Sequence, residues 1–202
     1  FVNKITSLPD QFKETGITNG SQVMKIGGSI YDFHLVKYVG VDQTNGATIY
    51  QVKNSNGEFE DTSITGTIDA TANRQLVGTA LPKFTGGFST NASYKNFDLS
   101  VAFSYQIGGK ILDNQYANLM SIGNSTANGW SPDILRAWTP ENTNTDVPRL
   151  EYLNQNLTPS FSDRFLTDAS FLSLRNVNLG YTINNELLQK TKVVKGLRVF
   201  VS

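Results

Sequence analysis

The 202-residue chain contains no cysteine, a single histidine and few charged residues. The absence of cysteine excludes a disulfide scaffold, a thiolate nucleophile and a cysteine-ligated metal. One histidine, His34, excludes a metal site built from several histidines. Lys and Arg number 17 and Asp and Glu also 17, so the formal net charge is zero. Without a positive surplus, no nucleic-acid partner is expected.

The sequence also lacks the apolar run of roughly 20 residues that a membrane-spanning helix requires. Aromatic residues nevertheless make up 11% of the chain, which argues against a disordered segment. Helical signals are confined to two short stretches, residues 131–138 and residues 184–190. In the first, Ser131 is a candidate N-cap and Pro132 suits the first helical position. Because the rest consists of strand, turn and loop signals, an all-β fold class is predicted.

The clearest pattern lies in two runs, residues 84–94 and residues 97–107. Each run alternates apolar with small polar residues, which is typical of a strand with one apolar and one polar face. Lys95 and Asn96 join the runs and suit a tight hairpin. Each run has about 11 residues, close to the roughly 9–11 of a tilted membrane-spanning strand.

The chemistry of the two faces favours a membrane over water. Phe84, Tyr94, Phe97 and Tyr105 lie near the ends of the runs, where a bilayer interface selects aromatic residues. The polar faces carry Ser, Thr, Gly, Asn and Gln instead of Lys and Glu. Small uncharged polar residues suit the lumen of a barrel better than the solvent face of a soluble sheet.

A third strand is predicted within residues 170–183, and a fourth begins near residue 197. Strict alternation of the third strand would place Arg175 on the same face as Val177, Leu179 and Tyr181. A lipid-facing arginine at the membrane midplane would cost roughly 2–4 kcal/mol. We therefore expect Arg175 to lie above the membrane or to extend to its interface, with the first half of the strand beyond the membrane.

Between these strands, residues 108–169 form a long stretch without sustained alternation. A loop of this length is unusual in a compact soluble domain but is typical of the outer side of a membrane barrel. Residues 26–53 indicate a further hairpin with its turn at residues 42–46, and residues 54–58 indicate a turn instead of a calcium loop.

Several of these segments resemble the SusC/RagA-type TonB-dependent outer-membrane transporters. The segments are LPKFTGGF (81–88), YKNFDLS (94–100), SDRFL (162–166), ASFLSLRNVNLGY (169–181) and LRVFVS (197–202). Trp130, Trp138-Thr139-Pro140 and Pro148-Arg149 also lie where such proteins place a Trp-rich external loop, and weaker similarity covers residues 26–51.

The resemblance implies that residues 1–202 form a C-terminal segment of a large antiparallel transmembrane β-barrel with roughly 22 strands and long extracellular loops. It implies energised import of glycan fragments or peptides across the cell outer membrane. The implied partners are a SusD-like surface lipoprotein, TonB through a region outside this chain, an oligosaccharide or peptide substrate, and the lipid bilayer. The plug domain, the TonB box and the terminal strand of the family are not found in the sequence, so the chain is expected to be a fragment of a longer polypeptide.

No catalytic residue, metal site or cofactor is predicted. His34 is interpreted as a packing or solvated residue, because no serine or cysteine partner pattern accompanies it. Trp130 and Trp138 are the candidate ligand-binding residues, because aromatic faces stack on sugar rings, although both could instead anchor the long loop. A second interpretation remains open, in which the chain is a soluble secreted β-sandwich that binds carbohydrate through these two tryptophans.

Overall fold

The computed structural model describes residues 3–121, 129–151, 161–184, 188 and 196–202. The chain divides into two units. We call Pro82–Gly109 with Ala169–Ser202 the sheet unit, and Phe1–Leu81 with Lys110–Asp168 the core unit. No helix among the described residues is long and apolar enough to cross a membrane.

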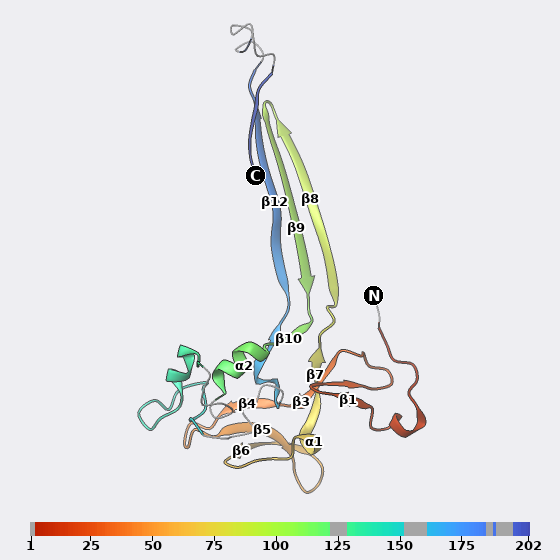
Figure 1. The fold of residues 1–202 in the computed structure, drawn as a ribbon, viewed down its shortest axis with the longest axis vertical. Helices are drawn as coiled ribbons and strands as arrows, with labels where there is room; N and C mark the ends of the chain where they lie inside the picture. The colour runs from red at the N-terminus through yellow and green to blue at the C-terminus, as the bar shows by residue number, and fades with distance from the viewer. Residues whose placement is uncertain (1–2, 122–128, 152–160, 185–187, 189–195) are drawn as a thin grey trace. The chain divides into compact units, whose positions relative to one another are not determined.

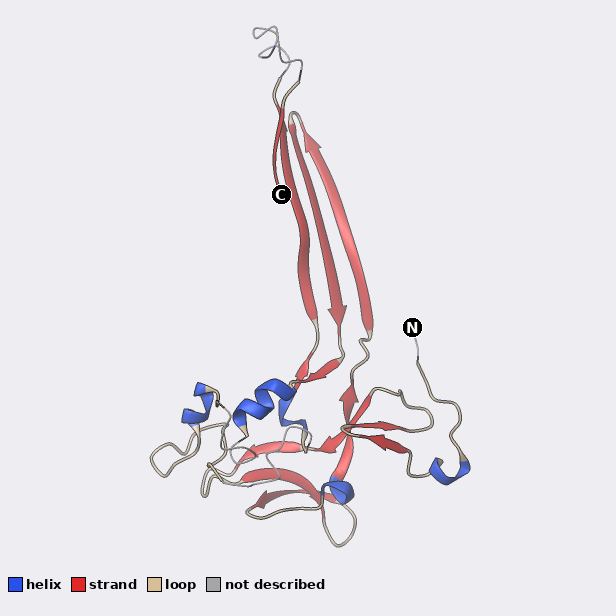
Figure 2. Cartoon of the chain, in the orientation of Figure 1, coloured by secondary structure: helices blue, strands red, loops and turns tan. Residues whose placement is uncertain are grey.

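The sheet unit is a four-stranded antiparallel sheet with the strand order β13-β12-β9-β8 (Figures 1 and 2). Its strands are β8 (Phe84–Tyr94), β9 (Phe97–Ile107), β12 (Phe171–Thr182) and β13 (Arg198–Val201). β8 and β9 each have 11 residues and pair from Tyr94↔Phe97 to Phe84↔Ile107. Lys95 adopts a positive φ of 55° in the turn between them. The hairpin predicted from the alternation is confirmed.

The register collects most large apolar side chains of the four strands on one face, whereas Phe171 and Phe200 lie on the opposite one. Because directly paired residues share a face, the partners of the apolar residues of β9 define that face across the sheet. Its larger members are Phe84, Phe88, Tyr94, Phe97, Leu99, Val101, Phe103, Tyr105, Ile107, Leu172, Leu174, Val177, Leu179, Tyr181, Val199 and Val201. We call it the apolar face, and the opposite one the polar face.

A β-bulge at Arg175 corrects the face assignment predicted for β12. The pairing shifts between Leu174↔Phe103 and Asn176↔Ala102, so Arg175 is an extra residue without a partner on β9. The bulge moves Leu174 onto the apolar face, and Arg175 donates through Nε to Ser104 Oγ at 2.7 Å on the polar face. The face predicted for Arg175 is therefore wrong, because strict alternation cannot anticipate the inserted residue, and its position relative to the membrane stays a prediction. β12 also pairs along nearly all of β9, so its first half is part of the same sheet.

The described residues of the core unit form three small antiparallel sheets, with orders β1-β2-β3-β7, β4-β5-β6 and β10-β11. Their strands are β1 (Ile17–Asn19), β2 (Gln22–Met24), β3 (Asp32–Val36), β4 (Tyr38–Val41), β5 (Thr48–Lys53), β6 (Phe59–Ile64), β7 (Arg74–Thr79), β10 (Lys110–Leu112) and β11 (Leu166–Asp168). The helices in the described part of this unit are α1 (Ala70–Asn73) and α2 (Asn114–Met120), with 3-10 turns η1 (Asp10–Phe12), η2 (Pro132–Arg136) and η4 (Asp163–Phe165).

The turns of the core unit agree with the sequence predictions. The hairpin within residues 26–53 is confirmed as β4–β5, and Gly46 N donates to Asp42 O at 2.7 Å in its turn. Asn54 Oδ1 accepts from the backbone N–H of Asn56, which forms the turn before β6. The helical signal at residues 131–138 is confirmed as η2, where the Ser131 side chain caps the N–H of Asp133. The second helical signal, at residues 184–190, lies mostly outside the described residues.

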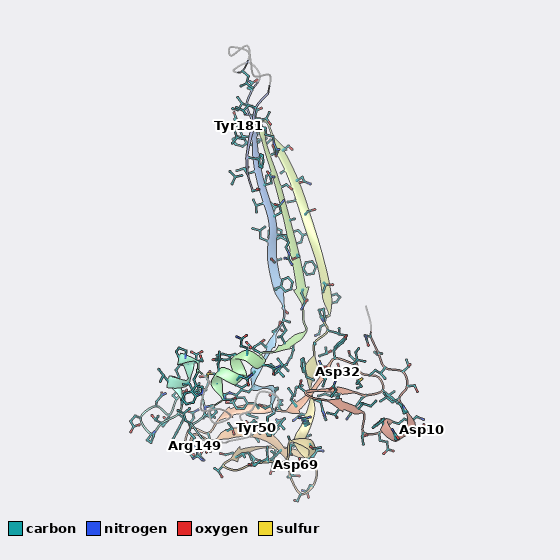
Figure 3. All side chains as sticks on the ribbon, in the orientation of Figure 1. Asp10, Asp32, Tyr50, Asp69, Arg149 and Tyr181 are labelled. Carbon is teal, nitrogen blue, oxygen red and sulfur yellow. The ribbon has the colours of Figure 1, made fainter. Side chains whose placement is uncertain are left out.

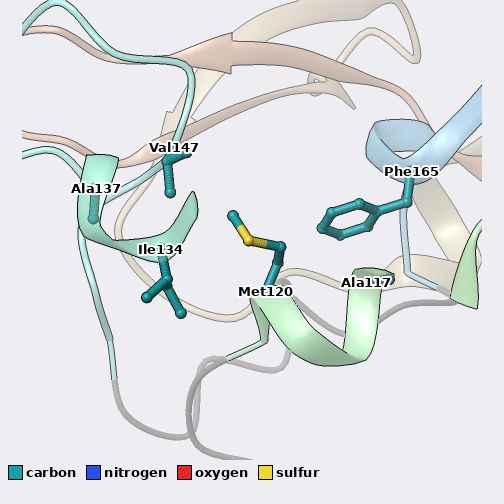
Figure 4. Close-up of a cluster of buried hydrophobic side chains, with 6 residues drawn as sticks. All are labelled: Ala117, Met120, Ile134, Ala137, Val147 and Phe165. Carbon is teal, nitrogen blue, oxygen red and sulfur yellow. The ribbon is translucent and has the colours of Figure 1, made fainter. Parts of the chain in front are cut away.

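The stretch from 108 to 169 is more ordered than predicted. Its described part contains β10, α2, η2, η4 and β11, and it builds a hydrophobic cluster of its own (Figure 4). The buried members of this cluster are Ala117, Met120, Ile134, Ala137, Val147 and Phe165. Alternation did not reveal this core, because a few apolar residues on a short helix, 3-10 turns and loops supply it.

Candidate membrane-facing sheet and ligand site

The apolar face of the sheet unit is exposed. Phe84 and Leu172 each leave 67% of their surface accessible, and Phe88 leaves 54%. Figure 3 shows side chains projecting from the strands β8, β9 and β12, and the described residues of the sheet unit form no second layer of strands. Contiguous apolar surface of this kind marks contact with a partner or a membrane.

Aromatic pairs lie across neighbouring strands of this face. Phe88 stacks on Phe103 with ring centroids 4.8 Å apart, and Phe97 contacts Tyr181 at 4.7 Å. Both are directly paired residues in the sheet. Cross-strand aromatic pairs stabilise a sheet beyond the area that they bury, so these contacts help to fix the register.

The polar face carries an ion pair that spans three strands. Asp98 on β9 and Arg198 on β13 meet above Gly180 of the intervening strand β12. Arg198 Nε donates to Asp98 Oδ1 at 3.2 Å. A Cβ at Gly180 would lie 2.6 Å from the Arg198 guanidinium and from both Asp98 carboxylate oxygens. The absence of a side chain at Gly180 therefore allows the pair to form.

In the core unit, the two predicted ligand-binding residues differ in their surroundings. Trp130 is 48% exposed. Trp138 is half-buried, and its Nε1 donates to Gln43 O at 3.0 Å. Its ring lies over Gly46, where a Cβ would come within 2.5 Å of the indole. Trp138 thus anchors its own segment to the β4–β5 turn, and ligand binding by either tryptophan remains a prediction.

A hollow of about 170 Å³ opens beside the cluster around Met120. Its apolar wall is formed by Met120, Val147 and Phe165, with the Met120 side chain extending between the other two (Figure 4). The remaining lining residues are Tyr38, Tyr116, Arg136, Asp146 and Arg164. We call it the Arg164 hollow. A second hollow of about 260 Å³ shares Arg136 and Asp146 with it.

The charged groups of the Arg164 hollow are unequally paired. Arg136 Nη2 lies 3.6 Å from Asp133 Oδ1, and Arg136 Nη1 lies 3.8 Å from Asp146 Oδ1. The Tyr116 hydroxyl donates to Asp133 at 2.8 Å, and burial together with this carboxylate raises the pKa of Tyr116. Among the described residues, by contrast, Arg164 has no carboxylate partner.

Aromatic rings hold Arg164 in place. Its guanidinium carbon lies 4.9 Å from the ring centre of Phe165 and 5.6 Å from that of Tyr38. Burial raises the pKa of Tyr38, although the positive charge of Arg164 opposes the shift. The adjacent Asp163 is engaged elsewhere, because its Oδ1 accepts from Tyr38 N at 2.7 Å.

His34 lies half-buried on strand β3. Burial is the main cause that lowers the pKa of His34, and the nearby charges of Lys25 and Arg74 lower it further. No group of three or more acidic or histidine side chains among the described residues could hold a metal ion.

No protein-family model matches the chain. Individual relatives do match. The chain is 33% identical, over 99% of its length, to TonB-dependent receptor P3 of Formosa agariphila, and it covers 20% of that receptor. It is 28% identical to the TonB-dependent receptor SusC of Bacteroides thetaiotaomicron, over 96% of this chain and 18% of SusC.

Solved structures agree with these relatives. The structure of the RagAB peptide transporter matches 98% of this chain and 21% of the matched chain, with a TM-score of 0.74 and 28% identity. The RagAB peptide importer in a "closed-closed" state matches with a TM-score of 0.73 and 28% identity, over 98% of this chain and 22% of that one. The chain is similar to a segment of the SusC/RagA-type TonB-dependent receptors. It spans about a fifth of the length of these relatives.

These similarities confirm the resemblance predicted from the motifs, and the structure confirms the all-β fold class. The soluble sandwich interpretation has no support, because the sheet unit exposes its apolar face and the relatives are receptors and importers. The Arg164 hollow escaped the sequence reasoning altogether. Arg164 was part of the SDRFL motif, but nothing in the sequence shows that Arg136 and Tyr116 lie beside the same hollow.

Proposed function

We propose that this chain is part of the barrel wall and outer loops of a nutrient importer of the cell outer membrane. The apolar face of the sheet unit would contact lipid, and the polar face would line the lumen. β8, β9 and β12 have 11 or 12 residues, which is enough to span the bilayer at the usual tilt. The observation that carries the proposal is the exposed apolar face, which water would disfavour.

The remaining strands of the barrel would come from the rest of the receptor. β8 and β13 each have one unpaired edge within the described sheet. Unpaired backbone groups are costly in lipid, so neighbouring strands must cover both edges. A position of this segment toward the C-terminal end of the receptor remains part of the proposal.

The substrate classes that the proposal includes are glycan fragments and peptides. The similarity to the RagAB peptide importer supports peptides, and glycan fragments follow from the resemblance of the sequence motifs. A SusD-like surface lipoprotein would capture the substrate with the receptor, and TonB would supply the energy through a region outside this chain. The proposal assigns transport without a catalytic step.

An uptake assay with the full-length receptor tests the proposal. Cells producing the receptor and its lipoprotein are supplied with fluorescent oligosaccharide and peptide mixtures, and accumulation in the periplasm is measured. We expect uptake of one class, and its loss when TonB is disrupted at unchanged receptor abundance. Uptake of neither class, or uptake that is independent of TonB, would overturn the proposal.

A further inference from the structure

The Arg164 hollow combines an available positive charge with an apolar wall. Arg164 is half-buried, and among the described residues no carboxylate lies within ion-pair distance of its guanidinium. A partly desolvated charge without a counter-ion is unfavourable for folding alone. The two ring contacts of Arg164 leave its charge without a counter-ion, so its guanidinium is available to an anionic ligand.

Arg136, the other cation of the hollow, is differently placed. It is shared between Asp133 and Asp146, so its charge is already balanced. Asp146 is exposed and lies on the side of Arg136, where it would repel an incoming anion. An anion entering the hollow would therefore be directed to Arg164.

The stacking of Arg164 favours a planar anion. The rings of Tyr38 and Phe165 contact the guanidinium and restrict its orientation. A fixed, planar guanidinium matches a carboxylate through two parallel N–H···O bonds, which a lysine cannot provide.

The size and wall of the hollow define the rest of the ligand. About 170 Å³ is below the roughly 300 Å³ at which pockets for whole small molecules begin, so only one end of a ligand fits. Met120, Val147 and Phe165 offer an apolar surface to the carbon atoms next to the carboxylate.

We propose that the Arg164 hollow binds a terminal carboxylate of the imported substrate together with the small apolar group that carries it. The inference rests on the proposed import function and adds a substrate class to it. Two sources share this chemistry: the C-terminal residue of a peptide and a uronic acid of a glycan.

Binding to the purified full-length receptor with its lipoprotein, measured by calorimetry, tests the inference. The probes are N-acetyl-alanyl-leucine against its C-terminal amide, and methyl glucuronide against methyl glucoside. We expect at least one acid to bind about tenfold more tightly than its neutral counterpart, the effect of one charge-assisted pair. A preference for one acid identifies the source, and a preference for both supports a shared carboxylate site.

Substitutions of Arg164 test whether this residue causes the preference for the acid probes. Arg164→Gln is expected to remove the acid preference while leaving the affinity for the neutral probe unchanged, and Arg164→Lys should restore it only in part. Lys13→Gln removes the same charge at an exposed position of the core unit and should change nothing. Equal affinity for acid and neutral probes in the wild type, no binding of any probe, or a preference that survives Arg164→Gln would overturn the inference. The uptake assay decides the import function separately, since it does not depend on the charge of the substrate.

Discussion

In the core unit, Leu35 and Tyr50 have no accessible surface, whereas in the sheet unit Phe84 and Leu172 leave 67% of theirs exposed. Among the described residues, Leu188 is the one buried hydrophobic side chain of the sheet unit, and all the others lie in the core unit. The two units thus remove apolar surface from water in different ways. The core unit packs its apolar side chains inside, whereas the sheet unit would need an apolar surrounding to cover them.

The largest expected effect lies in the core of the core unit. Leu35→Ala leaves a cavity at a fully buried position of β3 and should cost about 2–5 kcal/mol of the free energy of unfolding of this unit. Leu135→Ala is the matched control, because 86% of Leu135 is exposed, and it should change stability by less than about 0.5 kcal/mol. Hydrogen exchange of core-unit amides in the full-length receptor measures both. Equal effects of the two substitutions would contradict the assignment of this core.

A charge on the apolar face of the sheet unit should come next. Val101→Arg places an arginine near the middle of β9 and should cost about 2–4 kcal/mol if that position faces lipid. Ala102→Arg, one residue along on the polar face, is the control and should be tolerated. The amount of folded receptor in isolated membranes reports the difference. A tolerated Val101→Arg with a damaging Ala102→Arg would show that the two faces are reversed.

Alkaline pH should weaken the core unit through Tyr50. Burial raises the pKa of Tyr50 to about 12 from its ordinary value near 10. Because the folded state holds this proton more tightly than the unfolded state, the stabilisation is complete below pH 10 and is lost as the pH rises to about 12. The loss amounts to about 2–3 kcal/mol for two pH units.

Tyr50→Phe isolates this contribution. The variant should lose less stability than the wild type between pH 10 and pH 12 in the same hydrogen-exchange measurement, since phenylalanine has no proton to release. Parallel pH profiles of the two proteins would exclude Tyr50 as the source.

The smallest effect concerns the polar face of the sheet unit. Gly180→Ala would push the ion pair of Asp98 and Arg198 apart, because both side chains lie where the new Cβ would be. Both ends are mobile side chains, so we expect only a few-fold faster hydrogen exchange in β13. Gly40→Ala, where nothing lies within 4 Å of the added Cβ, should leave exchange in β13 unchanged. An identical response to both substitutions would remove the role given to Gly180.

The side-chain periodicity of each unit decides how much of its structure could be predicted from the sequence. The β8–β9 hairpin was predicted residue by residue, because a strand with two different faces records its register in the alternation of its side chains. The bulge at Arg175 was not predicted. One inserted residue moves the side chains on one side of it to the opposite face of the strand, without any change in amino-acid composition that would indicate it. The face predicted for Arg175 was wrong for this reason alone.

The core unit was harder to predict, because its contacts join residues far apart in the chain. Trp138 was selected for ligand stacking, yet the closeness of Gly46 and Gln43 to its ring depends on a contact across about 90 residues. Arg164 and Arg136 likewise line one hollow only after η2 and η4 have folded against α2. Neither arrangement has a local signal in the sequence.

Spin labels along β9 test most directly whether the apolar face of the sheet unit touches lipid. The chain has no cysteine of its own, so Ser100→Cys, Val101→Cys, Ala102→Cys and Phe103→Cys can each carry a label in the full-length receptor in lipid bilayers. Dissolved oxygen concentrates in the bilayer, so the collision rate of the label with oxygen should be high at positions 101 and 103 and low at positions 100 and 102. The collision rate with a water-soluble nickel complex should be low at positions 101 and 103. Low accessibility to both reagents at 101 and 103 would mean that protein covers this face, and would contradict the account.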